Sequence, residues 1–100
     1  MTLRFTRRAR NDLRDILEYI AKDNPAAADR LRLAFLDAGK LIAMRPHLGL
    51  RNANVPELRS RLVTRYPYRI HYLAEDANVW IIHIRHSAWS PWRPEGVRWP

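Results

Sequence analysis

The sequence of 100 residues has no cysteine, only three glycines and no long apolar run. The absence of cysteine excludes disulfide bonds, thiolate zinc sites and cysteine nucleophiles, and it fits a reducing compartment, so we expect a cytoplasmic protein. No apolar segment approaches the roughly 20 residues that cross a membrane, and the charged N-terminus lacks the apolar stretch of a secretory signal. Because carboxylate pairs, metal-ligand spacings and glycine-rich phosphate loops are also missing, we expect neither a metal nor a cofactor.

Arginine supplies almost all of the positive charge. Lys22 and Lys40 are the lysines, which leaves sixteen arginines among the 18 basic residues and a net charge of +8. The planar guanidinium suits carboxylate and phosphate groups and keeps its charge when it is partly buried. So small a basic domain is expected to bind a polyanion, either a nucleic acid or an acidic protein. The alternative is that the charge serves only solubility.

The first half of the sequence predicts a short strand and two helices. Leu3–Phe5 alternates apolar and basic residues as a strand does, and Thr6 suits a helix N-cap. Apolar residues at helical spacing then predict an amphipathic helix over Arg7–Lys22. Asn24 can cap a second helix over Pro25–Met44, since proline is well tolerated at the first helical position. The short connection predicts an antiparallel helical hairpin.

The second half predicts three consecutive strands. A loop over His47–Val55 precedes Leu58–Thr64, in which arginines alternate with other residues and so gather on one face. Tyr68–Ala74 and Val79–His86 are the next two strands, and a turn at 75–78 joins them. Apolar residues of Val79–His86 fall on both faces, which indicates a central strand that is covered on both sides.

These elements place the chain in the α+β class, as a single domain over residues 1–100. The order β-α-α-β-β-β predicts an N-terminal strand and an antiparallel helical hairpin packed on one face of a mostly antiparallel sheet. The opposite face is left to solvent or to a partner. The C-terminal tail, residues 87–100, holds prolines and tryptophans without periodicity and predicts irregular structure.

The pairing of the last two strands decides which charged residues share a face of the sheet. If the connecting turn pairs Ala74 with Val79, a regular period of two residues sets Arg69 opposite Ile84. A slip of one residue would turn every later side chain to the other face. We take the regular register as the hypothesis.

In that register, His86 points to the same face as Arg69 and His71. Arg85 then points to the other face, beside Tyr68. An arginine next to a histidine is a combination that could bind a phosphate and move a proton. The sequence therefore invites a catalytic interpretation of this end of the sheet.

Several short segments, each present once, follow one another in a characteristic order and spacing along the chain. They are Phe5–Ala9, Asp12-Leu13 with Ile16, Leu41-Ile42 with Pro46 and Gly49, Tyr68–Tyr72 (YRIHY), and Ile82–His86 (IHIRH). Together, over roughly Leu3–Ala88, these segments resemble the RelE/ParE superfamily of toxins from bacterial type II toxin–antitoxin systems. The resemblance implies a toxin that inhibits growth and is neutralised by a cognate antitoxin, whose C-terminal segment we expect to be acidic.

The resemblance implies one of two mechanisms. ParE-like members inhibit DNA gyrase and are associated with plasmid stabilisation, whereas RelE-like members enter the ribosome and cut mRNA. The tyrosine that nuclease members carry near the C-terminus is missing here, so we favour the ParE-like mechanism. The alternative is a ribosome-dependent mRNA endonuclease that uses Arg69, Arg85 and His86 as catalytic residues. A third option is an inactive member that only binds antitoxin.

Candidate contacts with the target or the antitoxin follow from the charge and from the resemblance. Three arginines lie on the basic side of one strand or directly after it. A fourth arginine matches the position of a phosphate-binding arginine in nuclease members. A histidine and a tryptophan lie near the end of the last strand. These residues are Arg59, Arg61, Arg65, Arg69, His86 and Trp89. The alternative for each is a structural or merely solvated side chain.

Overall fold

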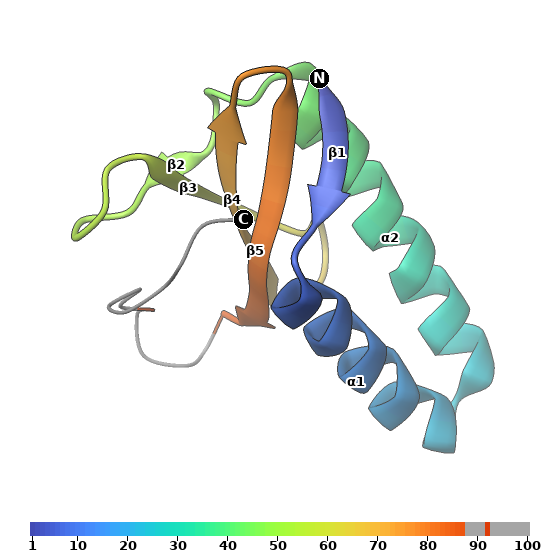
Figure 1. Cartoon of the computed structure of the whole chain (residues 1–100). Coiled ribbons are helices and arrows are strands. Elements are labelled where there is room, and N and C mark those ends of the chain that lie inside the picture. The colour runs from blue at the N-terminus through green and yellow to red at the C-terminus, as the bar shows by residue number, and fades with distance from the viewer. Residues whose placement is uncertain (88–91, 93–100) are drawn as a thin grey trace.

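The chain is described by a computed structural model over residues 1–87 and at Trp92, and it forms a five-stranded sheet with a helical hairpin on one face (Figure 1). The elements are β1 (Thr2–Phe5), α1 (Arg7–Asp23), α2 (Pro25–Met44), β2 (Leu50–Arg51), β3 (Leu58–Leu62), β4 (Tyr68–Glu75) and β5 (Asn78–His86). The strand order is β1-β5-β4-β3-β2, in which β1 runs parallel to β5 and the other neighbours are antiparallel. The predicted α+β architecture is confirmed.

Both predicted helix caps are present. The Thr6 hydroxyl accepts the Ala9 N–H at 3.1 Å and donates to the Ile82 carbonyl at 3.1 Å, so one side chain starts α1 and ties it to β5. Asn24 Oδ1 accepts the Ala27 N–H at 3.0 Å at the start of α2, with Pro25 as the first helical residue. Local sequence chemistry thus sets where the hairpin begins and turns.

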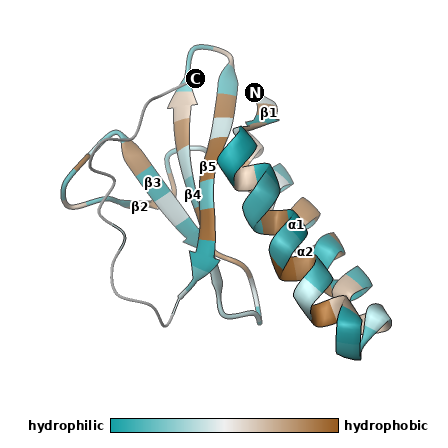
Figure 2. Ribbon diagram, turned by 60° about the horizontal axis from the view of Figure 1, so that its bottom comes forward, coloured by the Kyte–Doolittle hydropathy of each residue, from teal (hydrophilic) through white to brown (hydrophobic). Residues whose placement is uncertain are grey.

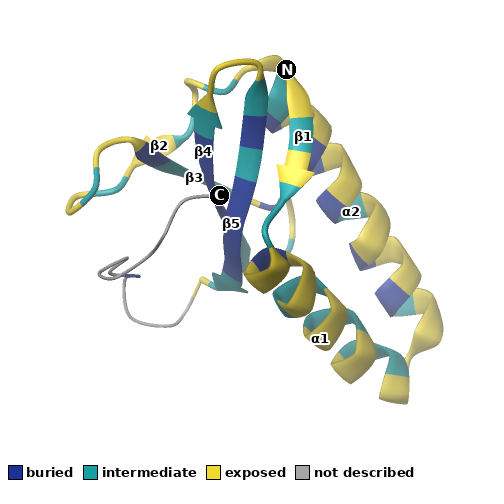
Figure 3. Cartoon of the chain, viewed as in Figure 1, coloured by how far each residue is buried: buried dark blue, intermediate teal, exposed yellow. Residues whose placement is uncertain are grey.

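The main core lies between the hairpin and the sheet. It joins α2 residues such as Leu31, Phe35 and Ile42 to Tyr72 and Ile81 of the sheet (Figures 2 and 3). A second, smaller cluster lies on the opposite face of the sheet and consists of Leu58, Leu73, Ile82 and Trp92. The face that was expected to be open is therefore partly buried, and β5 contributes apolar side chains to both clusters.

One strand was not predicted. Leu50–Arg51, within the segment expected to be a loop, pairs as β2 with Ser60 and Arg59 of β3. The Tyr72 hydroxyl anchors this segment, because it accepts the Gly49 N–H at 3.1 Å and donates to the Pro46 carbonyl at 2.8 Å. A contact made by a residue 23 positions away leaves no signature in the local sequence.

Two glycines allow close approaches to other elements. A β-carbon at Gly39 of α2 would lie 2.8 Å from the end of the Leu3 side chain of β1. A β-carbon at Gly49 would overlap the Tyr72 hydroxyl and lie 2.9 Å from the Ser60 carbonyl oxygen. The first obstacle is the tip of a flexible side chain, whereas the second is a buried hydroxyl together with backbone.

Gly49→Ala is therefore expected to destabilise the fold by about 2–3 kcal/mol, since the added methyl group breaks the Tyr72 hydrogen bonds. Gly39→Ala is the matched control. There the Leu3 side chain can shift, and the gain of about 1 kcal/mol in helix propensity offsets the crowding. Urea unfolding followed by circular dichroism compares the stability of the two variants. Equal losses of stability in both would contradict the close contact between Gly49 and the Tyr72 hydroxyl.

Candidate functional site

The predicted register between β4 and β5 is correct at the turn and wrong beyond it. Ala74 pairs with Val79 as expected, but the register shifts between Tyr72 and His71, which pair with Ile81 and His83. Ile82 is thus an extra residue on β5, a β-bulge. A regular alternation cannot anticipate such an insertion, and every side chain beyond it changes face.

The bulge regroups the candidate residues. Arg69 pairs with Arg85 instead of Ile84, so the two arginines share a face of the sheet. His86 pairs with Tyr68, and its ring packs edge-on against the Tyr68 ring at 5.6 Å. Tyr68 in turn contacts Phe35 of α2 at 5.8 Å, on the hairpin side. The predicted register, with His86 on the face of Arg69 and Arg85 beside Tyr68, is therefore wrong, although Arg69, Arg85 and His86 all line one cavity.

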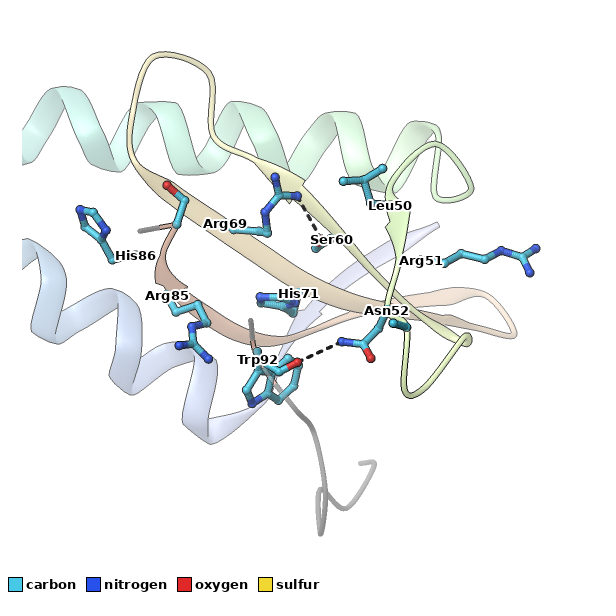
Figure 4. Close-up of a pocket in the computed structure, with 11 residues that line it drawn as sticks. Leu50, Arg51, Asn52, Ser60, Arg69, His71, Arg85, His86 and Trp92 are labelled. Atoms are coloured by element: carbon cyan, nitrogen blue, oxygen red, sulfur yellow. Dashed lines mark hydrogen bonds between the residues drawn. The ribbon is translucent and has the colours of Figure 1, made fainter. Parts of the chain in front are cut away.

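Arg69 and Arg85 border a cavity of about 340 Å³ on the face opposite the helices (Figure 4). Arg69 Nη1 donates to Ser60 Oγ of β3 at 3.0 Å, which fixes the guanidinium at the rim. None of the described residues that line the cavity is acidic. Like charges directly opposite on neighbouring strands destabilise a sheet. The cavity therefore presents two guanidinium groups from neighbouring strands, and guanidinium groups suit carboxylate and phosphate.

His71 forms the inner wall of the cavity and is only 6% exposed. Burial, followed by the nearby His83, Arg69, Arg85 and Arg8, lowers the pKa of His71 from 6.5 to about 3. The ring is therefore neutral at physiological pH. Because its affinity for a proton is low, it is also a poor general base.

His83 is held between α1 and β5. Its Nδ1 lies 2.7 Å from Asp12 Oδ2, and its Nε2 lies 3.5 Å from an Nη of Arg8. A carboxylate accepts and a guanidinium only donates, so Nδ1 carries the hydrogen and Nε2 is the acceptor. Asp12 also accepts the Ile84 N–H at 3.1 Å. Both ring nitrogens of His83 are thus engaged in holding the fold.

Trp92 covers the two histidines. Its ring lies 4.7 Å from the His71 ring and 4.9 Å from the His83 ring, and the Arg8 guanidinium lies over it at 5.7 Å. Asn52 Nδ2 donates to the Trp92 carbonyl at 3.3 Å (Figure 4). Sequence reasoning did not assign Trp92, Asp12 or Ser60 to this site, because their contacts bridge segments far apart in the chain. Trp89 lies outside the described residues.

The other predicted arginines lie away from the cavity. Arg59 Nη1 donates to the Gly49 carbonyl at 3.1 Å, so this side chain stabilises the β2 segment. Arg61 and Arg65 line a separate hollow against Leu41 of α2. Arg65 adopts a left-handed backbone conformation, with φ of 70°. The structure thus places the five described candidate residues in different environments.

Residues 1–87 and Trp92 contain neither a candidate metal site nor a candidate membrane span. No group of three or more histidine, cysteine, aspartate or glutamate side chains there could hold a metal ion. No helix in that part of the chain is long and apolar enough to span a bilayer.

A helical hairpin on one face of a mostly antiparallel sheet, with two arginines at a cavity on the other, defines a small basic α+β domain. Residues 3–90 match the family described as "ParE toxin of type II toxin-antitoxin system, parDE". The chain belongs to this family, within the RelE/ParE superfamily of toxins.

Individual relatives carry both names of the superfamily. The chain is 39% identical over 85 residues to "Toxin RelE2" of Caulobacter vibrioides, covering 84% of this chain and 92% of the relative. A chain of the chromosomal ParDE system from P. aeruginosa has a TM-score of 0.75 at 23% identity, over 86% of this chain and 95% of its own length. The isolated E. coli RelE toxin has a TM-score of 0.57 at 17% identity, over 89% and 86% respectively. The two structures show the shared fold.

The lowered pKa of His71 predicts how stability depends on pH. Unfolded His71 binds a proton near pH 6.5 and the folded form does not until about pH 3, so stability falls as the pH is lowered between these values. From pH 7 to pH 5 this histidine should cost about 2 kcal/mol. Urea unfolding at pH 7 and pH 5 measures how much stability wild type and His71→Gln each lose. Because the other titrating groups are the same in the two proteins, the difference between the two losses is the contribution of His71. Equal losses in the two proteins would contradict the burial of His71.

Proposed function

We propose that the chain is the ParE-like toxin of a type II toxin–antitoxin pair. It acts in the cytoplasm, inhibits DNA gyrase by binding, and is neutralised by an acidic segment of its cognate antitoxin. Membership of the ParE family supports the toxin role. A similar protein is named RelE2, although the matching family is named after ParE. The names alone therefore do not decide between gyrase and the ribosome as target.

The packing of the His86 ring against Tyr68 supports binding over cleavage. RNA cleavage requires a group that activates the ribose hydroxyl and one that protonates the leaving oxygen, both close to the cations that hold the phosphate. The ring of His86 instead packs against Tyr68, on the hairpin side of the sheet. His86 also lines the cavity of the two arginines, but its ring is packed against Tyr68, so the three residues form a surface for an anion rather than a complete acid–base set.

The two remaining histidines near the arginines support the same conclusion. His71 has its pKa lowered to about 3 by burial and neighbouring charges, so it is a weak base. His83 uses one ring nitrogen on Asp12 and the other on Arg8. Neither ring is available to exchange a proton with a bound phosphodiester without loss of its present contacts.

Ribosome-dependent mRNA cleavage is the second candidate. The adjacency of Arg69 and Arg85 at one cavity favours it, because paired guanidinium groups stabilise a phosphate in a transition state. In this case the ribosome and mRNA are the partners. A chain that has lost activity and only binds antitoxin is the remaining alternative.

One paired experiment distinguishes these functions. Purified toxin is added to gyrase in a supercoiling assay, and primer extension maps mRNA ends after induction without antitoxin. The proposal predicts loss of supercoiling and no new mRNA ends. Toxin-dependent cuts within translated codons, abolished by Arg69→Ala, would establish the nuclease instead. Absence of both effects, and of growth inhibition, would identify the inactive form.

The hollow beside Arg61 and Arg65 is the proposed contact for the acidic antitoxin segment. Leu41 and Leu62 also line it, and both are more than two-fifths exposed. Asp37 is the acidic lining residue, so the hollow offers two cations against one carboxylate, together with apolar anchors. Such a mixture suits an acidic segment that also carries apolar side chains. Arg59 is already bonded to Gly49 and takes less part.

Charge reversal tests this contact. Arg61→Glu and Arg65→Glu should each weaken antitoxin binding about tenfold or more, because each replaces an attraction with a repulsion. Arg14→Glu, on the exposed side of α1, is the matched control and should have little effect. Isothermal titration calorimetry with the antitoxin measures the affinities. Unchanged affinity in both test variants would remove this surface from the proposal.

A further inference from the structure

Helix α2 carries apolar side chains on two opposite faces. The inner face is buried against the sheet and includes Leu31, Phe35 and Ile42. The outer face carries four large apolar side chains that remain exposed: Leu33 at 53%, Leu36 at 43%, Leu41 at 43% and Met44 at 73%. Figure 3 shows the buried positions of α2 towards the sheet and exposed positions away from it. A helix that carries large apolar side chains on two opposite faces is often covered on both sides.

The outer residues form one continuous stripe. At 3.6 residues per turn, the four apolar residues fall within an arc of about 140° that is centred opposite the buried face. Asp37 and Lys40, both exposed, lie in the same arc between them. Scattered exposed apolar residues are ordinary on a protein surface, but a stripe along three turns of one helix marks an interaction surface.

The stripe is complementary to a second copy of itself: apolar positions on one side of its centre match apolar positions on the other side, and an acidic position matches a basic one. When a second copy of α2 is laid antiparallel with its centre between residues 38 and 39, Leu33 meets Met44 of the copy and Leu36 meets Leu41. In the same register Asp37 meets Lys40. Two-fold symmetry repeats each pairing in reverse, as an isologous interface requires. A parallel arrangement would instead set Asp37 against Asp37 and Lys40 against Lys40.

We propose that the outer face of α2 binds a second copy of this chain, antiparallel and about a two-fold axis near Gly39. The observation that selects this partner is the self-complementarity, since an unrelated partner has no need for a stripe that mirrors itself about its own centre. The contact extends over about three helical turns, which is less than a standard interface, so the dimer is weak and forms at micromolar concentrations or above.

A charge swap tests both the partner and the register. Sedimentation equilibrium of the purified full-length chain, from about 5 to about 500 μM, measures its self-association. Asp37→Lys and Lys40→Asp alone should each weaken the dimer about tenfold, because each creates two like-charged pairs across the axis. The double variant Asp37→Lys/Lys40→Asp should recover wild-type association. Recovery is the result expected if these two positions face each other between copies.

Control variants separate this surface from general stickiness. Leu33→Glu should abolish association, whereas Tyr19→Glu, at a more exposed apolar residue of α1, should leave it unchanged. All of these positions are exposed, so circular dichroism should show unaltered folding. A chain that is monomeric over the whole range overturns the proposal, as does a double variant that associates no better than the single ones. If Leu33→Glu weakens antitoxin binding while wild type stays monomeric, the stripe belongs to the antitoxin.

Because the chain has no cysteine, introduced cysteines can report the register by disulfide cross-linking. Leu36→Cys and Leu41→Cys chains are mixed and oxidised gently. The antiparallel register predicts that the mixed disulfide forms faster than either self-linked product, since residue 36 of one copy faces residue 41 of the other. Equal rates for all three products would exclude this register.

Discussion

The carboxylate of Asp12 is the contact on which the rest of the site depends. It accepts one hydrogen bond from the His83 ring and one from the Ile84 backbone, and so fastens α1 to β5 directly after the bulged residue Ile82. β1 ends opposite Ile81, so the Ile84 N–H has no partner on a neighbouring strand there. A buried N–H without a partner would cost about 1–3 kcal/mol, and Asp12 removes this cost while it orients the imidazole.

That anchored bulge determines the chemistry of the open face. Beyond it, Arg69 and Arg85 lie together over His71, while the ring of His86 packs against Tyr68 on the hairpin side. A sheet with a regular register would have placed the His86 side chain on the face of Arg69, as the nuclease interpretation requires. The insertion of one residue instead produces a cationic surface with a buried neutral histidine behind it, which is better suited to binding than to proton transfer.

Local signals account for the predicted parts of the fold and long-range contacts for the missed ones. Thr6, Asn24 and Pro25 identify the helix boundaries because capping involves neighbours within three residues. β2 depends on the Tyr72 hydroxyl, and the bulge depends on Asp12, 71 residues from its histidine partner. Family membership was recognisable from spaced segments, whereas the residues that share the cavity could be grouped only once the register was known.

The register between Ile70 and Ile84 is the most direct test of this account. These residues form a directly opposed pair on β4 and β5, and the Ile84 N–H points away from β4 towards Asp12. Their α-protons therefore face each other across the strands, as in a pair without mutual hydrogen bonds. We predict a strong nuclear Overhauser effect between these two α-protons in solution. A strong effect between the α-protons of Ile70 and His83 instead would show a regular register and would return His86 to the face of Arg69.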